Sequence, residues 1–298
     1  MPFGERGIED KNGSGAFTGR NSCPGGRRIT AAGDCFLRHS WRLGCSDRGE
    51  IVYGNQHVFE NLDALYLALL SQWRQNAAAA IAERGAFHVS LAGGNTPRGF
   101  YAALAQDTAN EVDLWRQTHV YFGDERCVPQ DHPDSNYRMA REALLSKVPV
   151  PAEHVHPMYD AVLSVEENVA QYARLLQDTL PQDAQGHPVF DLVLLGMGDD
   201  GHTASLFPGT GILDEYHQPV AAQFVEKLNA WRISLTFATL NAARHVVILV
   251  AGDTKADILA EIFSAPEDVR YPIQRVRPQG RLDWYLDAAA ASLLPGGA

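Results

Sequence analysis

Four strand-like segments of this chain end in the same way, and this shared ending constrains the fold more than any other feature. Each segment passes directly into a short loop of glycine and polar residues. The loops cover residues 92–97, 123–126, 196–202 and 251–255. Helix-like segments separate the strands, which is typical of an α/β fold with a parallel sheet. The carboxyl ends of parallel strands share one edge of a sheet, so we expect the four loops to meet at one ligand site.

The periodicity of apolar residues predicts the remaining elements. Apolar side chains recur every three or four positions after Asn61, which predicts a helix capped by Asn61 and ended by Gly85. Further helices are expected to start at Ser135, at Ser164 and with Thr96 as N-cap before Pro97, and a last one is expected over residues 284–294. Strands are expected over residues 87–91, 118–122, 190–195, 233–237 and 245–250. These elements predict a single α/β domain over residues 51–298, with a mainly parallel sheet and helices on both faces.

Residues 1–50 differ in character from the rest of the chain. They hold three of the four cysteines and ten of the 26 glycines, and they show neither helical nor strand periodicity. We interpret them as a disordered N-terminal extension, although a misassigned start codon would look the same. Cys23, Cys35 and Cys45 form no Cys-x-x-Cys pair, which argues against a zinc site. The arginines leave an organelle transit peptide as an alternative, against which three acidic residues among the first ten argue.

The charge balance disfavours two classes of partner. Lys and Arg number 25 against 36 Asp and Glu, a net charge of -11. Residues 1–50 carry eight basic and six acidic side chains, which leaves 17 against 30, or -13, for residues 51–298. A general affinity for nucleic acid or an anionic membrane therefore has no electrostatic basis. The chain has neither a membrane-spanning apolar run nor a secretory signal, so we expect a cytoplasmic protein. We expect it to be a monomer or a homodimer.

The loop at residues 92–97 has the features of an anion-binding loop. Gly93 and Gly94 let backbone N–H groups approach a ligand, Thr96 offers a hydroxyl, and a helix N-terminus follows. A plain tight turn explains this loop alone equally well. The sequence has no Lys-Ser or Lys-Thr here, which excludes a Walker A loop, and Gly196 and Gly198 lack the third glycine of a dinucleotide fingerprint.

Two cations could complete a phosphate site at the same edge. Arg232 stands at the start of the strand expected at residues 233–237, and Lys255 lies in the first turn of the helix after Val250. A phosphomonoester carries roughly -1.5 to -2 charge near neutral pH, so an acidic protein that binds one needs such cations nearby. A solvated surface position is the usual alternative for either residue.

His202 is the best candidate for proton transfer. An imidazole titrates near neutral pH, and His202 lies in a glycine-bounded loop at the expected edge. A helix-capping or core position is the alternative. Asp200 could orient the imidazole, bind substrate hydroxyls or act as a helix cap. Asp124 and Arg126 offer opposite charges in the adjacent loop, where a structural salt bridge is the alternative, above all for Glu125.

The absence of some motifs narrows the chemistry. No Gly-x-Ser-x-Gly elbow occurs, and Ser205 is not placed like a nucleophile beside a base. No His-Glu-x-x-His or Cys-His ligand cluster is present either. These absences favour direct attack by base-activated water, without a metal or a covalent intermediate.

Several strings of the sequence resemble the 6-phosphogluconolactonases, hydrolases of the oxidative pentose phosphate pathway. They are AGGNTP (92–97), GDERCVPQDHPDSN (123–136), LLGMGDDGHTASLFPG (194–209), RISLTFATLN (232–241) and AGDTKA (251–256). The resemblance implies a Rossmann-like fold shared with glucosamine-6-phosphate deaminases and ribose-5-phosphate isomerases. It also implies no cofactor and hydrolysis of 6-phospho-D-glucono-1,5-lactone, a sugar-phosphate lactone, to 6-phosphogluconate.

The resemblance also implies roles for matching residues. His202 would be the general base, and Asp124 and Asp200 would help to position either this base or the sugar. The phosphate would be held by Gly93, Gly94, Thr96, Arg232 and Lys255. From its loop and charge, Arg126 is a candidate for stabilising the oxyanion at the lactone carbonyl. Family members often have Ser-Gly-Gly-Ser where this chain has residues 92–95, so a hydroxyl at position 92 has no role here.

Two other functions stay open at this point. An amino-sugar phosphate deaminase or isomerase would use an acid a few residues after the Asp-Gly-His, but residues 203–208 contain no carboxylate. A noncatalytic sugar-phosphate sensor would keep Arg232 and Lys255 but would not need a base. His202 argues against the sensor.

Overall fold

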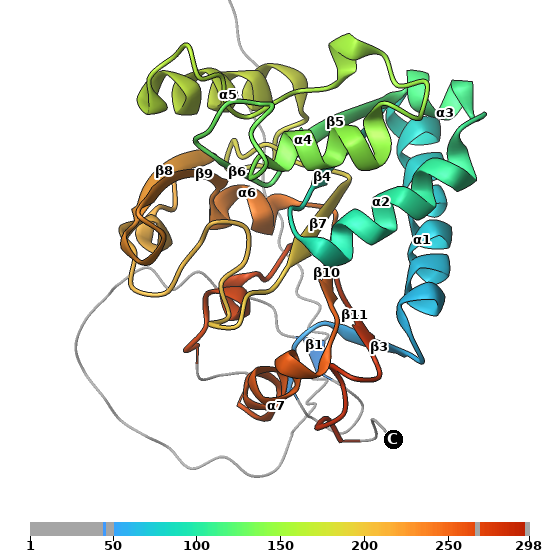
Figure 1. Cartoon of the computed structure of the whole chain (residues 1–298), viewed down its shortest axis with the longest axis vertical. Helices are drawn as coiled ribbons and strands as arrows, with labels where there is room; N and C mark the ends of the chain where they lie inside the picture. The colour runs from blue at the N-terminus through green and yellow to red at the C-terminus, as the bar shows by residue number, and fades with distance from the viewer. Residues whose placement is uncertain (1–43, 46–50, 266–268, 296–298) are drawn as a thin grey trace, which may run out of the picture. The chain divides into compact units, whose positions relative to one another are not determined.

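A six-stranded sheet, parallel throughout, forms the centre of the computed structural model (Figure 1). The strands, in spatial order, are β3 (Asn55–Phe59), β11 (Arg281–Asp287), β10 (His245–Val250), β7 (Leu192–Gly196), β4 (Phe87–Leu91) and β5 (Thr118–Phe122). β10 is buried at every position and β7 at four of its five, as their continuous apolar runs predict. The predicted α/β fold with a mainly parallel sheet is confirmed.

The structure describes residues 44–45, 51–265 and 269–295, which belong to one compact unit, Leu43–Ala298. The predicted extension, residues 1–50, lies outside the described residues except for β1 (Gly44–Cys45). β1 pairs antiparallel with β2 (Ile51–Val52). In the described ranges, no helix combines the length and the apolar character needed to cross a bilayer.

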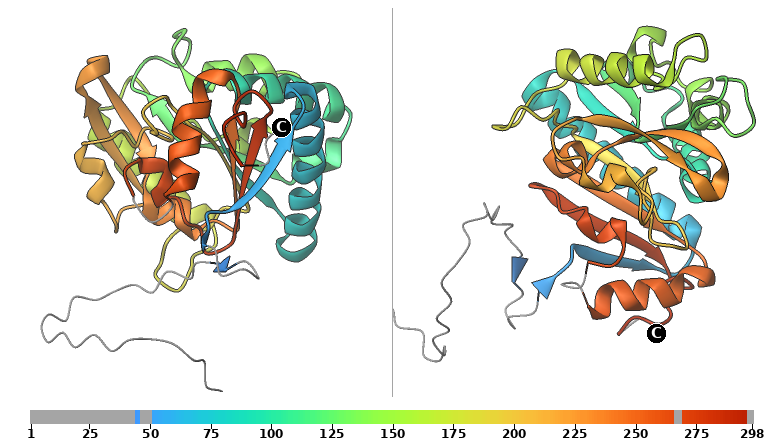
Figure 2. Two further views of the ribbon diagram at one scale, coloured as in Figure 1. Left: turned by 90° about the horizontal axis from the view of Figure 1, so that it is seen from below. Right: turned by 90° about the vertical axis from the view of Figure 1, so that its left-hand side faces the viewer.

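Helices cover both faces of the central sheet (Figure 2). The α-helices in the described part of the chain are α1 (Leu62–Arg84), α2 (Asn95–Thr108), α3 (Val112–Arg116), α4 (Asn136–Ala140), α5 (Val165–Thr179), α6 (Phe237–Ala242) and α7 (Ala256–Ser264). α1 and α2 pack together, α1 against β3, β4 and β11 and α2 against β7 and β10. From α7, on the opposite face, Phe263 packs edge-to-face on Trp284 of β11, with ring centroids 5.1 Å apart.

The helix boundaries follow the capping residues in most cases. Asn61 accepts a hydrogen bond from the backbone N–H of Ala64, and Gly85 ends α1 in the left-handed conformation, as predicted. The helix starts at Ser135 and Ser164 are also confirmed. The prediction that Thr96 caps α2 is wrong, because Gly94 is the N-cap and the helix begins at Asn95. Pro97 still lies in the first turn, where its missing N–H leaves no bond unmade.

A second, antiparallel sheet corrects two predictions. It contains β6 (Asp124–Arg126), β9 (Ala230–Leu235) and β8 (Val220–Val225), in that order. Asp124 and Arg126 therefore lie in a strand and not in a loop. The strand predicted at residues 233–237 is β9, which pairs antiparallel with β6 and β8, outside the central sheet, and the chain enters α6 at Phe237. A short apolar run does not specify which strand it pairs with, so this arrangement depends on tertiary structure.

The helix predicted over residues 284–294 is wrong, because residues 281–287 are a strand and residues 288–295 form turns. Residues 281–287 form β11, which pairs parallel with β3 and β10. Trp284, Tyr285 and Leu286 are all buried, since both faces of this strand are covered. A short run buried on both faces has no strand alternation to distinguish it from a buried helix turn.

Candidate active site

The site lies where the order of the parallel strands reverses. β4 and β7 are neighbours, and the chain continues outward from β4 to β5 on one side and from β7 to β10 and β11 on the other. Open α/β sheets bind ligands at such a point, beyond the carboxyl ends of the strands. The loops after β4, β7 and β10 line one cavity of about 370 Å³ there, together with Gly123 and the strand β6 that follow β5. The four segments therefore meet as expected, although the second of them is largely a strand.

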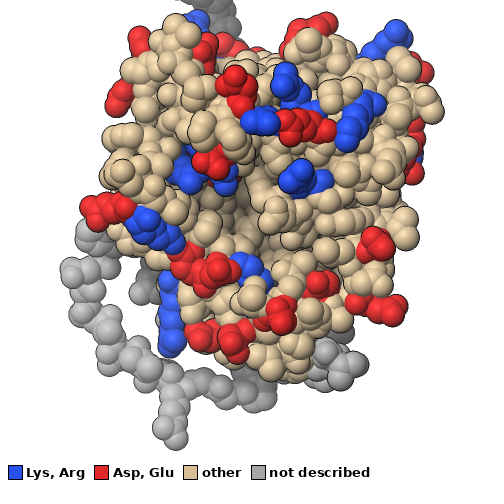
Figure 3. All heavy atoms as spheres, in the orientation of Figure 1, with Lys and Arg blue, Asp and Glu red and all other residues tan. Residues whose placement is uncertain are grey.

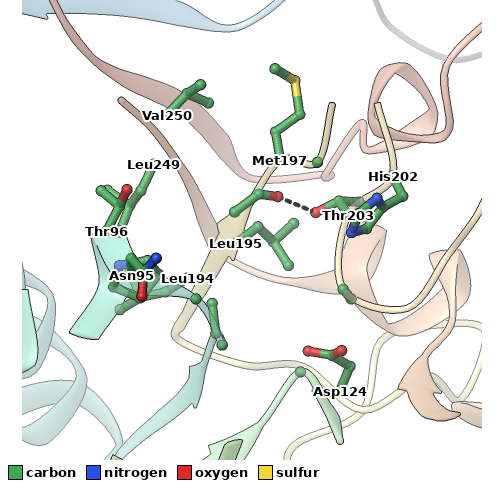
Figure 4. Close-up of a pocket in the computed structure, with 18 of the residues that line it drawn as sticks. Asn95, Thr96, Asp124, Leu194, Leu195, Met197, His202, Thr203, Leu249 and Val250 are labelled. Carbon is green, nitrogen blue, oxygen red and sulfur yellow. Dashed lines mark hydrogen bonds between the residues drawn. The ribbon is translucent and has the colours of Figure 1, made fainter. Parts of the chain in front are cut away.

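The structure brings most of the candidate residues to this cavity. Its lining includes Gly93, Gly94, Thr96, Asp124, Arg126, His202 and Lys255. Asp200 and Arg232 are not among its lining residues but contact or pair with residues that are. Figure 4 shows Asn95 and Thr96 on one side of the cavity and His202 on the other.

The glycine loop is shaped by the side chain of Asn136. A Cβ atom at Gly93 would lie 2.1 Å from Oδ1 of Asn136, so any larger residue would displace that amide. Gly94 has a φ of 103°, which L-residues with a Cβ rarely adopt. α2 begins at the next residue, so its first backbone N–H groups lie beside the cavity, where an anion would accept hydrogen bonds from them.

Asp124 is held by two buried polar side chains. Ser205 Oγ donates a hydrogen bond to its Oδ2 at 2.6 Å. Asn136 Nδ2 donates to the Asp124 carbonyl oxygen at 2.9 Å and to Oδ1 at 3.2 Å. Since Asp124 is only 8% exposed, these donors replace most of its water. The sequence gives little signal for Asn136 beyond the helix start at Ser135, and none for Ser205 as a partner of Asp124.

The neighbouring Glu125 has a structural role. Its carboxylate accepts hydrogen bonds from Ser135 Oγ and from the backbone N–H groups of Arg126, Asn136 and Tyr137, at 2.7 to 3.1 Å. Burial raises the pKa of Glu125, and the three backbone donors oppose this shift. Glu125 thereby fixes the start of α4. The salt bridge expected as its structural role is replaced by these hydrogen bonds, while Arg126 Nη1 donates to the carbonyl oxygen of Asp134 at 2.5 Å.

His202 and Asp200 form a pair in the loop after β7. The Nδ1 atom of His202 lies 2.5 Å from Oδ1 of Asp200. Burial opposes the ionisation of Asp200, but hydrogen bonds from Lys227 and His202 lower its pKa to about 2. Asp200 is thus a carboxylate at neutral pH, and we assign the Nδ1 proton to the bond that it accepts. The Nε2 atom then carries the lone pair that a general base requires.

The imidazole ring of His202 is also fixed from its faces. It stacks on the ring of Phe207, with centroids 4.2 Å apart. A Cβ atom at Gly198 would lie 2.0 Å from its Cε1 atom, so only glycine lets the ring approach the backbone this closely. The second glycine of the Gly-x-Gly segment therefore makes room for the histidine.

Arg126 and Arg232 are paired residues of β6 and β9. The Nε atom of each is buried and has no hydrogen-bond partner among the described residues. Burial and the charge of Arg126 lower the pKa of Arg232. Two adjacent guanidinium groups with unused donors suit an anionic ligand, which would satisfy the donors and offset the repulsion.

The third cation, Lys255, already has an anionic partner. It ends the short helix η5 (Asp253–Lys255), and its ammonium group pairs with the carboxylate of Asp199. Its side chain is 17% exposed, whereas that of Asp199 is 82% exposed.

The space-filling view shows a hollow on this face of the molecule, with basic and acidic side chains near its rim (Figure 3). Among the described residues, no three His, Cys, Asp or Glu side chains are grouped to hold a metal ion.

The family model for glucosamine-6-phosphate isomerases/6-phosphogluconolactonase matches residues 60–284. The chain belongs to this family. A 6-phosphogluconolactonase of Synechocystis sp. is 44% identical over 216 residues, which are 72% of this chain and 88% of the relative. The 6-phosphogluconolactonase 3, chloroplastic, of Arabidopsis thaliana is 36% identical over 71% of this chain and 66% of its own length. The resemblance in the sequence motifs is thus confirmed.

Solved structures of family members share the fold. The 6-phosphogluconolactonase of Trypanosoma brucei superposes with a TM-score of 0.73 and 30% identity, covering 81% of this chain and 99% of its own. A monomeric glucosamine-6-phosphate deaminase reaches a TM-score of 0.66 with 19% identity, which is a likeness of fold alone. The predicted Rossmann-like fold is confirmed.

Proposed function

We propose that this protein hydrolyses 6-phospho-D-glucono-1,5-lactone to 6-phospho-D-gluconate, a step of the oxidative pentose phosphate pathway. The observation that carries the proposal is the Asp200–His202 pair, which faces the glycine loop across one cavity. This arrangement offers a base at one end and an anion site at the other. The similar proteins named 6-phosphogluconolactonase support the choice of substrate.

The phosphate end of the substrate would lie at the glycine loop. Backbone N–H groups of Gly93, Gly94 and the start of α2 would donate to its oxygens, with the hydroxyl of Thr96 beside them. Lys255 would add a positive charge from the loop after β10. Arg232 would contribute through its unused guanidinium donors. Arg126, which lines the cavity, would serve the lactone end.

His202 would act first as the general base and then as the general acid. Its Nε2 atom takes a proton from a water molecule, whose oxygen attacks the lactone carbonyl carbon. The carbonyl oxygen becomes an oxyanion, which Arg126 stabilises. The bond between this carbon and the ring oxygen then breaks, and the ring oxygen takes the proton from the imidazolium. Asp200 stabilises the imidazolium in between, as the carboxylate of a catalytic triad does. Water is the only second reactant, so we propose neither cofactor nor metal.

The test of the function is a coupled assay with freshly made 6-phosphogluconolactone, corrected for spontaneous hydrolysis. We expect the purified protein to accelerate product formation above the blank. Glucosamine 6-phosphate serves as a second substrate, because a deaminase of the same family would release ammonia from it. Failure to exceed the blank with the lactone would rule out the proposed reaction.

Replacing Arg232 with alanine is expected to raise KM by about tenfold or more, because a hydrogen bond to a charged group contributes roughly 1.5 to 3 kcal/mol. We expect kcat to change much less, unless phosphate binding also orients the lactone. The matched control is Arg174→Ala, whose side chain is 83% exposed on α5. An unchanged KM in the Arg232 variant would exclude Arg232 from the phosphate site.

The cellular location and the oligomeric state stay predictions. We propose a cytoplasmic protein that acts as a monomer or homodimer, with no nucleic-acid or membrane partner. Some relatives carry the word chloroplastic in their names, among them proteins of rice and Arabidopsis thaliana. Fractionation of cells that express the full chain would distinguish an organelle from the cytoplasm.

A further inference from the structure

Lys227 reaches the active site from a separate part of the fold. It lies in the short helix η4 (Glu226–Leu228), which connects β8 to β9. Its ammonium group pairs with Oδ2 of Asp200, 27 residues away in the sequence. The other oxygen of that carboxylate, Oδ1, faces the Nδ1 atom of His202 at 2.5 Å. The two oxygens of Asp200 are thus divided between Lys227 and His202.

A second contact links Lys227 to the same histidine. Its Nζ atom lies 4.8 Å from the centroid of the Phe207 ring, within the range of a cation–π interaction. That ring stacks on the imidazole of His202. Lys227 therefore contacts both side chains that fix His202, the carboxylate at its edge and the aromatic ring at its face.

We propose that Lys227 is a positioning residue of this active site, which fixes the Asp200 carboxylate so that Oδ1 points at His202 and which offsets part of its charge. The inference rests on the proposed role of His202 as the base. An exposed ion pair contributes little to stability, and the Lys227 side chain is 52% exposed. The expected effect is therefore on the chemistry of His202 and not on folding.

The charge of Lys227 also affects the protonation of the base. In general a carboxylate favours the protonated form of a nearby imidazole, and a cation disfavours it. Asp124 and Arg126 on β6 and the Lys255–Asp199 pair also border or approach the cavity, but a change at position 227 leaves them in place. Removing Lys227 should therefore keep His202 protonated to a higher pH, where it cannot act as a base.

The test compares Lys227→Met, Lys227→Arg and the control Lys147→Met, which alters an exposed lysine outside the cavity lining. For Lys227→Met we expect kcat at neutral pH to fall about tenfold with little change in KM, because Lys227 does not line the cavity. The acid limb of kcat against pH should move upward by about 0.5 to 1 pH unit. Lys227→Arg should restore both, and the control should match the wild type.

A double variant tests whether Lys227 acts through Asp200. In an Asp200→Asn background, adding Lys227→Met should cause little further loss of kcat, since the partner charge is already gone. If the two losses multiply, or if Lys227→Met leaves kcat and the acid limb unchanged in an active enzyme, Lys227 is not a positioning residue.

A measurement without substrate separates this inference from the proposed function. The ring signals of His202 in NMR spectra, assigned by their loss in His202→Gln, should titrate at higher pH in Lys227→Met than in the wild type. If this shift occurs but the wild type does not hydrolyse the lactone, the proposed function is wrong and the contact between Lys227 and Asp200 stands. An unchanged titration would overturn the inference whatever the activity.

Discussion

Replacing His202 with glutamine is expected to lower kcat for lactone hydrolysis by ~10²-fold or more, because general-base catalysis typically contributes this factor. Glutamine is similar in size and its amide can still donate a hydrogen bond to Asp200. Its amide cannot take a proton from water at neutral pH, so only the base is lost. The coupled assay, corrected for spontaneous hydrolysis, measures kcat and KM.

Two comparisons make this prediction specific to the base. His217→Gln changes an exposed histidine in the segment before β8 and should leave kcat unchanged. Binding of the product 6-phosphogluconate to His202→Gln, measured by calorimetry, should stay within about threefold of the wild type, because the phosphate site is intact. A kcat near the wild-type value in His202→Gln would mean that another group activates the water.

Replacing Asp283 with alanine is expected to lower the free energy of unfolding by about 3 to 5 kcal/mol, the usual cost of breaking a buried charged network. The Asp283 side chain is fully buried on β11. Its Oδ1 accepts a hydrogen bond from Asn55 Nδ2 at 2.9 Å and lies 3.2 Å from His57 Nε2. Its Oδ2 lies 2.8 Å from His245 Nε2 and 2.6 Å from Arg281 Nε. One carboxylate thus joins β3, β10 and β11.

Urea unfolding followed by tryptophan fluorescence measures this loss. The control is Asp178→Ala on α5, whose side chain is 67% exposed and whose ion pair with Arg174 should contribute less than about 0.5 kcal/mol. Asp283 lies near the start of β11, at the sheet edge opposite the cavity, so folded Asp283→Ala should keep kcat and KM. A stability equal to that of the control variant would contradict the role of this network.

The pH dependence of the loss has a definite sign. Burial opposes ionisation of Asp283, but hydrogen bonds from His245, Asn55 and His57 and the charge of Arg281 hold its pKa far below the usual range. A depressed pKa in the folded state adds stability above the unfolded value of roughly 3.9, and this stability is lost as the pH falls further. The difference between the wild type and Asp283→Ala should therefore be widest at neutral pH and shrink below about pH 4.

The elements that the sequence predicts correctly are those that depend on local chemistry. Asn61 and Ser164 mark helix starts because their side chains satisfy nearby backbone N–H groups, whatever the rest of the fold does. The strands β7 and β10 follow from continuous apolar runs between helices. The wrong helix at residues 284–294 and the unexpected pairing of β9 have one cause. A short apolar run specifies neither whether it forms a helix or a strand nor which strand it pairs with.

The sequence alone determined that four loops meet at one edge of a parallel sheet and that Asp200 lies near His202, because strand direction and a separation of two residues fix both. Only the tertiary structure decided that Ser205 and Asn136 donate hydrogen bonds to Asp124. It also decided that Arg126 pairs with Arg232 across two strands and that Lys227 forms an ion pair with Asp200. These contacts join residues far apart in the chain. They depend on the register of the small sheet and on the packing of the whole domain, which no local pattern records.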